Sequence, residues 1–259
     1  MTVRRRASVV QQERDAFLLP QIAALKREHP FWGYRRVWAT LRFHHGLAVN
    51  PKRVARLMRL HDLTVRRTTL KAKRTPPKSK PRATRPRQWW GIDMTKVMTE
   101  SGWVYIVLIV DWFSKKIVGW DAGYQSRAAD WLAAVDMAIT AEFPSGTRGQ
   151  GLHLISDNGC QPTSNRFMQE CNILGITQAF TTYNNPKGNA DTERMMRTLK
   201  EELLWLEEWR GLDHIRARLA AWVTWFNTNY LHSALGYRTP QYVHLHAETG
   251  KPNTPLIAA

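Results

Sequence analysis

The chain has few cysteines, no long apolar run and few acidic residues in its first third. Its two cysteines, Cys160 and Cys171, have no CxxC spacing, which gives no disulfide framework and suits a reducing cytosol. The histidines are scattered and have no cysteine partner at ligand spacing, which argues against structural zinc. The longest apolar run, residues 103–110, is far shorter than the roughly 20 residues of a spanning helix, and the N-terminus lacks the apolar stretch of a secretory signal. We therefore expect a cytoplasmic protein without a membrane partner.

The shortage of acidic residues is confined to the N-terminal part. The net charge of the whole chain is +17. Residues 1–90 contain 23 Lys and Arg against 4 Asp and Glu, net +19, whereas residues 91–259 contain the remaining 15 against 17, net −2. This distribution predicts that the N-terminal part binds a polyanion, nucleic acid before an anionic membrane. The rest of the chain is expected to have a different role.

Three short helices are predicted in the basic part. The first runs from Asp15 to His29, before Pro30, and the second from Tyr34 to His45. A third is expected over residues 51–60, because Asn50 is a good N-cap and Pro51 suits the first helical position. The apolar residues that should face inward are Phe17, Leu18, Ile22, Leu25, Val37, Trp38, Leu41, Val54, Leu57 and Met58.

The outer side of the third helix is basic. Three short helices with a basic last one resemble a helix-turn-helix fold, so residues 1–63 are predicted to form a helix-turn-helix-like DNA-binding domain. The alternative is a solvated basic surface on a small helical bundle. Residues 64–88 are rich in Lys, Arg and Pro and nearly free of apolar side chains, which predicts an extended linker that follows phosphates. The predicted DNA-binding residues of the third helix are Lys52, Arg53, Arg56 and Arg59.

The pattern changes at Trp89 to short apolar runs separated by turns. An antiparallel meander is predicted first, and helices and further strands follow, which together indicate an α/β fold with a mixed sheet. The polar loop at residues 181–191 precedes a long helix that begins near Ala190. The expected strands are 89–98, 103–113, 115–123, 152–158 and 176–180, and the intervening helices are 126–142 and 164–174.

A helical wheel of the segment after Ala190 separates an apolar face from a charged one. The charged face carries Glu193, Arg197 and Lys200 at positions i, i+4 and i+7. Taken alone, this triplet is typical of an exposed face with salt bridges. The apolar residues expected to pack on the sheet are Met195, Leu199, Leu203 and Leu206.

Two aspartates are predicted to form one site with Glu193. Asp93 lies inside the first expected strand, and Asp157 lies just past the apolar run of the fourth. Carboxylates from separate elements that meet at one sheet edge repel each other unless cations lie between them. Mg²⁺ prefers oxygen ligands, and a pair of such ions can promote an in-line phosphodiester displacement. The pattern therefore predicts a site with two Mg²⁺ ions, for which Mn²⁺ can substitute.

The chain resembles the DDE transposase and retroviral integrase core in three ordered motifs. These motifs are "WWGIDMT" (89–95), "ISDNGCQPTSNRF" (155–167) and "YNNPKGNADTERMMRTLKEE" (183–202). The interval of 35 residues between Asp157 and Glu193 matches that family. The resemblance implies a ribonuclease H-like fold over residues 89–210, with residues 211–259 as a C-terminal helical extension and tail.

The same resemblance implies the roles of individual residues. Asp93, Asp157 and Glu193 would be the catalytic, metal-binding triad of a DDE-type polynucleotidyl transferase. Lys200 matches a basic position that contacts DNA. The resemblance gives Arg197 no role, but Arg197 shares the helical face of Lys200 and is predicted to contact DNA for that reason alone.

Two flanking segments narrow the family further. "HPFWGYRRVWATL" (29–41) and "LHSALGYRTP" (231–240) resemble the second open-reading-frame product of a bacterial insertion-sequence family whose transposase gene is split into two frames. That likeness implies cleavage and strand transfer at terminal inverted repeats, insertion into target DNA, and a multimer on the DNA. It also implies fusion to, or action with, the first-frame product, and a place at the bacterial nucleoid.

Several residues and functions are alternatives to this interpretation. Asp111 also closes a buried strand, although three carboxylates already satisfy the family pattern, and Asp191 suits the first turn of a helix. Cys160 lacks a histidine partner nearby and is a poor candidate nucleophile. The aromatic stretch 222–230 is expected in the core, with stacking on an unpaired base as the alternative. A DNA-binding regulator without catalysis and a nuclease of RNA–DNA hybrids are the competing functions.

Overall fold

The computed structural model describes residues 9–65, 82–181 and 189–247. The chain divides into two compact units, Met1–Lys73 and Arg74–Ala259, which are described separately. Most of the predicted linker and loop, and the end of the tail, lie outside the described residues, and the four domain boundaries stay predictions. No helix within the described ranges is long and apolar enough to cross a membrane.

The first unit contains three helices, as predicted: α1 (Val9–Glu28), α2 (Tyr34–Phe43) and α3 (Pro51–Leu60). The side chain of Asn50 accepts a hydrogen bond from the Lys52 amide, which caps α3 as expected. The predicted inner faces are largely confirmed, but Phe17 is 65% exposed, and α1 starts six residues before the predicted start. Phe17 is exposed because the two short helices that pack on α1 cover only part of its circumference. The residues at the centre of this small core are Leu18, Ile22, Leu25, Val37, Leu41, Val54, Leu57 and Met58.

The second unit is built on one mixed sheet of five strands in the order β3-β2-β1-β4-β5. The first three strands form the predicted antiparallel meander, whereas β4 pairs parallel with both β1 and β5. The strands are β1 (Trp89–Thr99), β2 (Gly102–Asp111), β3 (Ile117–Gly123), β4 (His153–Ser156) and β5 (Thr177–Phe180).

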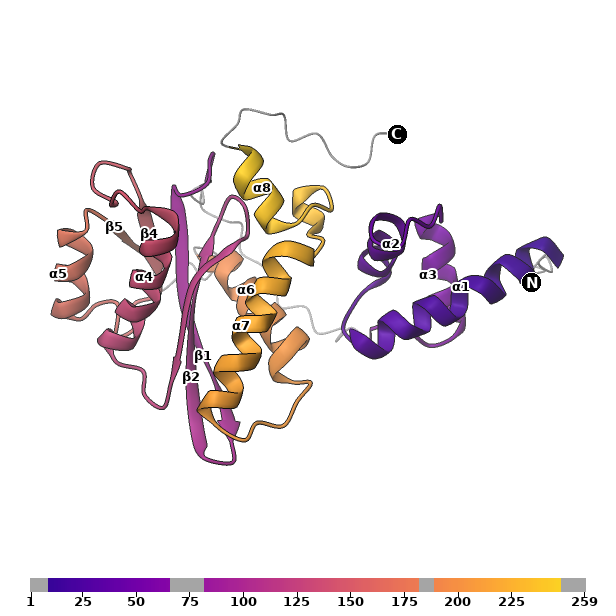
Figure 1. Ribbon diagram of the computed structural model, residues 1–259, viewed down its shortest axis with the longest axis horizontal. Helices are drawn as coiled ribbons and strands as arrows, with labels where there is room; N and C mark the ends of the chain where they lie inside the picture. The colour runs from indigo at the N-terminus through magenta and orange to yellow at the C-terminus, as the bar shows by residue number, and fades with distance from the viewer. Residues whose placement is uncertain (1–8, 66–81, 182–188, 248–259) are drawn as a thin grey trace, which may run out of the picture. The chain divides into compact units, whose positions relative to one another are not determined.

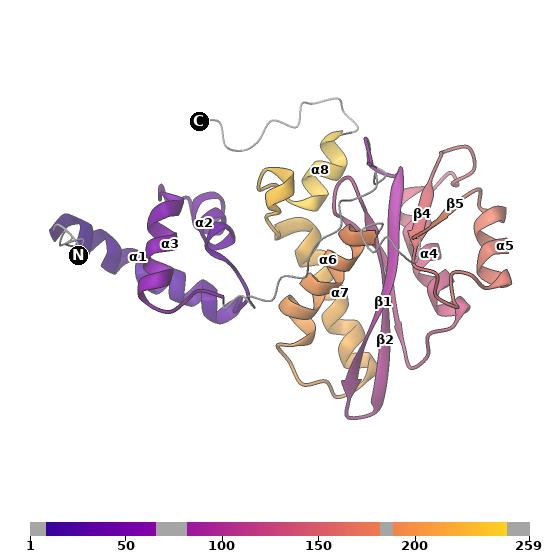
Figure 2. The same ribbon diagram turned by 180° about the vertical axis from the view of Figure 1, so that it is seen from behind.

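Helices cover both faces of this sheet (Figures 1 and 2). On one face α4 (Ala128–Glu142) and α5 (Asn165–Ile173) pack on side chains of β1 and β2 such as Ile92 and Ile109. On the other face α6 (Ala190–Leu199) and α7 (Leu212–Asn229) pack on the alternate residues, among them Ile106 and Leu108. Because both faces are covered, β2 is apolar almost throughout instead of alternating.

The helix that begins at Ala190, as predicted, changes its winding after ten residues. It continues as a π-helical turn, η2 (Lys200–Leu204), in which the amide of Trp205 donates to the carbonyl of Lys200 at 2.9 Å. Met195, Leu199 and Leu203 are buried as expected, but Leu206 is 39% exposed. The prediction for Leu206 was wrong because a wheel of 100° per residue does not hold beyond a π-helical turn.

A buried polar network attaches the last helix, α8 (Pro240–Ala247), to the sheet unit. His244 Nε2 lies 2.7 Å from Glu142 at the end of α4, and His244 Nδ1 lies 3.0 Å from the hydroxyl of Ser114. Lys116 donates to the other oxygen of Glu142 at 2.6 Å. Burial raises the pKa of Glu142, but the hydrogen bonds from His244 and Lys116 outweigh it and lower the pKa to about 2.

Candidate active site

The sheet register brings two of the predicted catalytic residues level with each other. In the parallel pair of β1 and β4, Gly91 lies opposite Ile155. Continuing that register by two residues places Asp93 opposite Asp157, which directly follows the last residue of β4. The topology therefore brings together carboxylates that are far apart in the sequence.

A turn shapes the segment that carries Asp157. The carboxylate of Asp157 accepts a hydrogen bond from the amide of Gly159 at 3.1 Å, and Asn158 donates to the carbonyl of Thr181 at the end of β5. Asp157 is exposed, whereas Asp93 is partly buried and bears the cost of desolvation. Asn158 and Gly159 hold the turn through these two contacts.

The third carboxylate comes from α6. Glu193 lies in the first turn of this helix, which three side-chain contacts attach to the sheet unit. The indole of Trp112 donates to Thr192 Oγ1 at 3.1 Å, and the side-chain amide of Asn189 lies 3.5 Å from the carbonyl of Ile92. Asp191 lies in the first turn of α6, as expected, and pairs with Lys115 at 3.4 Å.

The charges around Asp93 link it electrostatically to the other two carboxylates. Burial is the main reason why the pKa of Asp93 rises to about 6, and the negative charges of Asp157 and Glu193 raise it further. The amide of Met94 and the ammonium group of Lys200 act in the opposite direction. Such a carboxylate is stabilised strongly by any cation that approaches it.

A cavity of about 400 Å³ opens at this point. Its polar lining comes from Asp93, Glu193, Lys200 and Arg197, the last of which pairs with Glu201 at 2.7 Å. Three of its lining residues come from outside the sequence predictions, namely Met94, Met196 and Trp205.

The donor set fits a hard divalent cation. Among the described residues, no group of three or more His, Cys, Asp or Glu side chains is placed to hold a metal ion by itself. Mg²⁺ usually takes only one or two protein carboxylates, with water and substrate phosphates completing its shell. Asp93 and a neighbouring carboxylate therefore suit Mg²⁺ in the presence of a phosphodiester.

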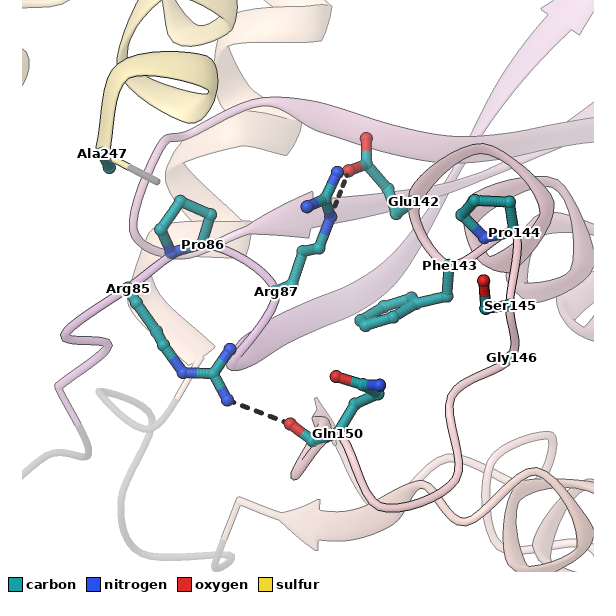
Figure 3. A pocket seen from close by; sticks show the side chains of 10 residues that line it. All are labelled: Arg85, Pro86, Arg87, Glu142, Phe143, Pro144, Ser145, Gly146, Gln150 and Ala247. Atoms are coloured by element: carbon teal, nitrogen blue, oxygen red, sulfur yellow. Dashed lines mark hydrogen bonds and ion pairs between the residues drawn. The ribbon is translucent and has the colours of Figure 1, made fainter. Parts of the chain in front are cut away.

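A larger cavity, of about 510 Å³, lies between the start of β1 and the end of α4 (Figure 3). Its charged side chains already have partners within the protein. Arg87 pairs with Glu142 at 2.9 Å, and Arg85 donates to the carbonyl of Gln150 at 3.0 Å (Figure 3). We therefore place the chemistry in the smaller cavity.

Two candidates from the sequence belong to the framework of the fold. Asp111 is fully buried and accepts hydrogen bonds from the amides of Arg87, Phe113 and Ser114 and from the Ser114 hydroxyl, which explains its burial without a metal. In the aromatic stretch, Trp222 is 7% exposed and belongs to the core, as expected.

In the three-helix unit, the predicted DNA-binding residues divide into two pairs. Arg53 and Arg56 bind the carboxylate of Asp15 on α1, at 2.7 and 2.5 Å. Lys52 and Arg59 are exposed. All four DNA-binding assignments stay predictions.

Sequence comparisons agree with this architecture. Residues 83–186 match an integrase core domain family, residues 174–240 match a second integrase core family, and residues 12–70 match an HTH-like domain. A transposase for insertion sequence element IS904 from Lactococcus lactis is 32% identical, with 92% of this chain and 96% of that transposase covered. A transposase for insertion sequence element IS629 from Shigella sonnei is 30% identical over 88% of this chain and 79% of its own length.

A solved structure supports the fold. A chain of the simian T-cell lymphotropic virus intasome, in complex with PP2A regulatory subunit B56 gamma, superimposes with a TM-score of 0.55 at 17% identity. The match covers 85% of this chain and 77% of that chain. The predicted α/β, ribonuclease H-like core with a helical HTH-like unit before it is thereby confirmed.

These matches define a protein with an integrase core, whose function is DNA transposition and integration. The chain belongs to the transposases of insertion sequence elements.

Proposed function

We propose that this transposase cleaves and joins DNA strands at the ends of its insertion sequence, with Asp93, Asp157 and Glu193 as a metal-binding triad. The observation that carries the proposal is the environment of Asp93. Its carboxyl group is partly buried, its pKa is raised by burial and by the charges of Asp157 and Glu193, and it lines a cavity with Glu193 and Lys200. Groups arranged in this way gain stability from a bound cation.

Each residue of the site has a separate role in this proposal. Asp93 on β1, Asp157 directly after β4 and Glu193 in the first turn of α6 would hold two Mg²⁺ ions, for which Mn²⁺ can substitute. When bound, the ions would activate the attacking oxygen and stabilise the leaving one. Lys200 and Arg197 contact phosphates of the DNA beside the scissile bond.

The reaction proceeds in two displacements at phosphorus. Water attacks a phosphodiester at the terminal inverted repeat, and the leaving oxygen becomes a free 3′-hydroxyl. This hydroxyl then attacks a phosphodiester of the target DNA and joins the element to it, while a target 3′-oxygen leaves. No covalent enzyme intermediate is required.

The basic residues of α3, Lys52, Arg53, Arg56 and Arg59, and the basic linker bind the DNA around the site. We propose that the protein acts as a multimer on DNA in the bacterial cytoplasm, at the nucleoid. It would work with, or fused to, a first-frame product.

Cleavage of a labelled element-end duplex in Mg²⁺ or Mn²⁺ tests this function. Wild type and the Asp157→Asn and Glu193→Gln variants are compared as the single chain and as the fusion with the first-frame product. Both substitutions remove charge with little change in shape, so cleavage should fall at least about 10³-fold while DNA affinity stays within about threefold. Asp136→Asn, on the exposed side of α4, is the matched control and should cleave normally.

The competing functions give different results. Cleavage that persists in Glu193→Gln would refute the triad. DNA binding without cleavage in every form would indicate a regulator, and cleavage confined to RNA–DNA hybrids would indicate a nuclease.

A further inference from the structure

Trp205 combines high exposure with a position at the candidate active site. Its side chain is 59% exposed, although large aromatic side chains are normally buried. It also lines the cavity that contains Asp93 and Glu193, and within the described residues it is the one aromatic in that lining. An exposed indole at a site for DNA chemistry suggests contact with the substrate.

The π-helical turn determines this position. Trp205 is five residues after Lys200, and in a regular α-helix it would point about 140° away from that residue. Instead, the hydrogen bond from the Trp205 amide to the Lys200 carbonyl closes a wider turn, so that both residues line the same cavity. Single π-helical turns of this kind occur frequently at functional sites.

The cavity then offers separate groups for the phosphates and for the base of a nucleotide. Asp93 and Glu193 provide carboxylates for cations at the scissile phosphate. Lys200 provides a positive charge for a phosphate, and Trp205 provides a flat apolar surface of the size of a base. A duplex cannot use that surface while its bases are paired, because their faces are already stacked.

We propose that Trp205 is the platform of a nucleobase subsite, on which an unpaired base next to the scissile phosphate of the element end stacks. The inference rests on the proposed function, because it places the scissile phosphate at Asp93 and Glu193. Stacking on an aromatic ring depends little on base identity, so Trp205 holds the opened strand in position without reading its sequence.

Other aromatic residues do not meet both conditions. Trp222 is buried in the core, and Trp225 is packed against it. Trp103 is 43% exposed, but it lies near the tip of the β1–β2 hairpin. There the ammonium nitrogen of Lys96 lies over its ring, 4.5 Å from the ring centroid. Trp103 is therefore a matched control of the same residue type.

The first test measures strand cleavage by wild type, Trp205→Ala, Trp205→Phe and Trp103→Ala on the terminal repeat that flanks the coding sequence. Trp205→Ala should cleave about tenfold more slowly, whereas Trp205→Phe should keep most of the rate and Trp103→Ala all of it. Thermal unfolding should change only slightly in Trp205→Ala, because more than half of the side chain is exposed.

An abasic scan identifies the stacked base. Single abasic sites are placed within three nucleotides on either side of the cleaved bond. At one position the loss of the base should slow wild type about tenfold and leave Trp205→Ala unaffected, because the interaction is already absent there. Additive effects at every position would overturn the proposal.

A photochemical test does not depend on cleavage. 5-Iodouracil replaces the base identified in the scan, and the wild-type complex is irradiated in Ca²⁺. The adduct should map to Trp205 and disappear in Trp205→Ala, with Trp103→Ala unchanged. An adduct at another residue would refute the subsite.

The two proposals fail in different ways. If Glu193→Gln still cleaves but 5-iodouracil reacts with Trp205, the triad is wrong and the base contact stands. If Glu193→Gln is inactive while Trp205→Ala cleaves like wild type without an adduct, the triad stands and the subsite is refuted. A Trp205→Ala variant that fails only to form multimers would indicate a protein contact and would also refute it.

Discussion

Trp112 Nε1 donates a hydrogen bond to Thr192 Oγ1 at 3.1 Å, across 80 residues of sequence. Thr192 is fully buried, and the next residue is Glu193. The contact therefore fixes the first turn of α6, and with it the position of the proposed third carboxylate. It exists only because Gly91, two residues before Asp93, leaves room for both side chains.

Gly91→Ala should displace α6 from the sheet. The new Cβ atom would overlap Thr192 Oγ1 and Trp112 Nε1, so the helix or the indole must move. We expect a loss of about 1–3 kcal/mol in the free energy of unfolding and a drop in strand cleavage of more than tenfold. Urea unfolding and the cleavage assay measure the two effects.

Gly123→Ala is the control, because its new Cβ atom meets the Gln125 carbonyl oxygen at an ordinary 3.7 Å. Normal stability and activity in Gly91→Ala would show that α6 does not depend on this close approach.

Asp93→Asn should stabilise the metal-free protein at neutral pH. The folded pKa of Asp93 is about 6 against an ordinary value of 3.8, so between these values the unfolded chain has lost a proton that the folded chain keeps. The free energy of unfolding therefore falls as the pH rises through this window. Asp93→Asn should raise the free energy of unfolding by about 1–2 kcal/mol at pH 7 and should leave it unchanged below about pH 4.

Chemical unfolding in EDTA at several pH values measures this difference. Asp136→Asn, which is exposed on α4, should change nothing. A destabilised Asp93→Asn protein at pH 7 would contradict the proposed electrostatics of the site.

Glu142→Gln should loosen α8. The substitution removes the charge that binds Lys116 and His244 and leaves those groups buried with a weaker partner. We expect the free energy of unfolding to fall by about 2–4 kcal/mol at pH 7. Because the folded pKa of about 2 lies below the ordinary value of 4.5, this contribution is present above pH 4.5 and disappears as the pH falls toward 2.

Acid unfolding of wild type, Glu142→Gln and Glu170→Gln measures this effect. Glu170 is exposed on α5, so its substitution should leave the unfolding curve unchanged. A constant difference between wild type and Glu142→Gln from pH 7 to pH 2 would argue against a stabilising role of the charge.

Arg59→Gln should weaken DNA binding without a loss of stability, whereas Arg53→Gln should affect both. Arg53 binds Asp15, whose side chain is only 15% exposed, so its loss should destabilise the three-helix unit by about 1 kcal/mol. Arg59 is exposed, so Arg59→Gln should leave stability unchanged and weaken DNA binding. The salt dependence of the DNA affinity should fall by the equivalent of about one phosphate contact.

Hydrogen exchange in α1 and α3 of the full chain reports the first effect, and salt-dependent DNA titration reports the second. Equal protection in both variants would mean that the Asp15 pair contributes nothing to the unit.

Local pattern was sufficient for much of the fold. Asn50 and Pro51 define the start of α3, and alternating runs with short turns define the meander of β1 to β3, because such signals depend on neighbouring residues only. The family followed from three ordered motifs and the interval from Asp157 to Glu193. These features needed no knowledge of distant contacts.

The tertiary structure decided which side chains share a site and which only build the framework. Asp111 and Asp93 look alike in the sequence, yet one is saturated with hydrogen bonds and the other faces two negative charges. Trp205 became a candidate only when a π-helical turn replaced the regular winding that a helical wheel assumes. The sequence by itself determined the class of protein and predicted its three acidic site residues. The burial of Asp93, the hydrogen bonds of Asp111 and the position of Trp205 depend on contacts and winding that the sequence pattern alone does not contain.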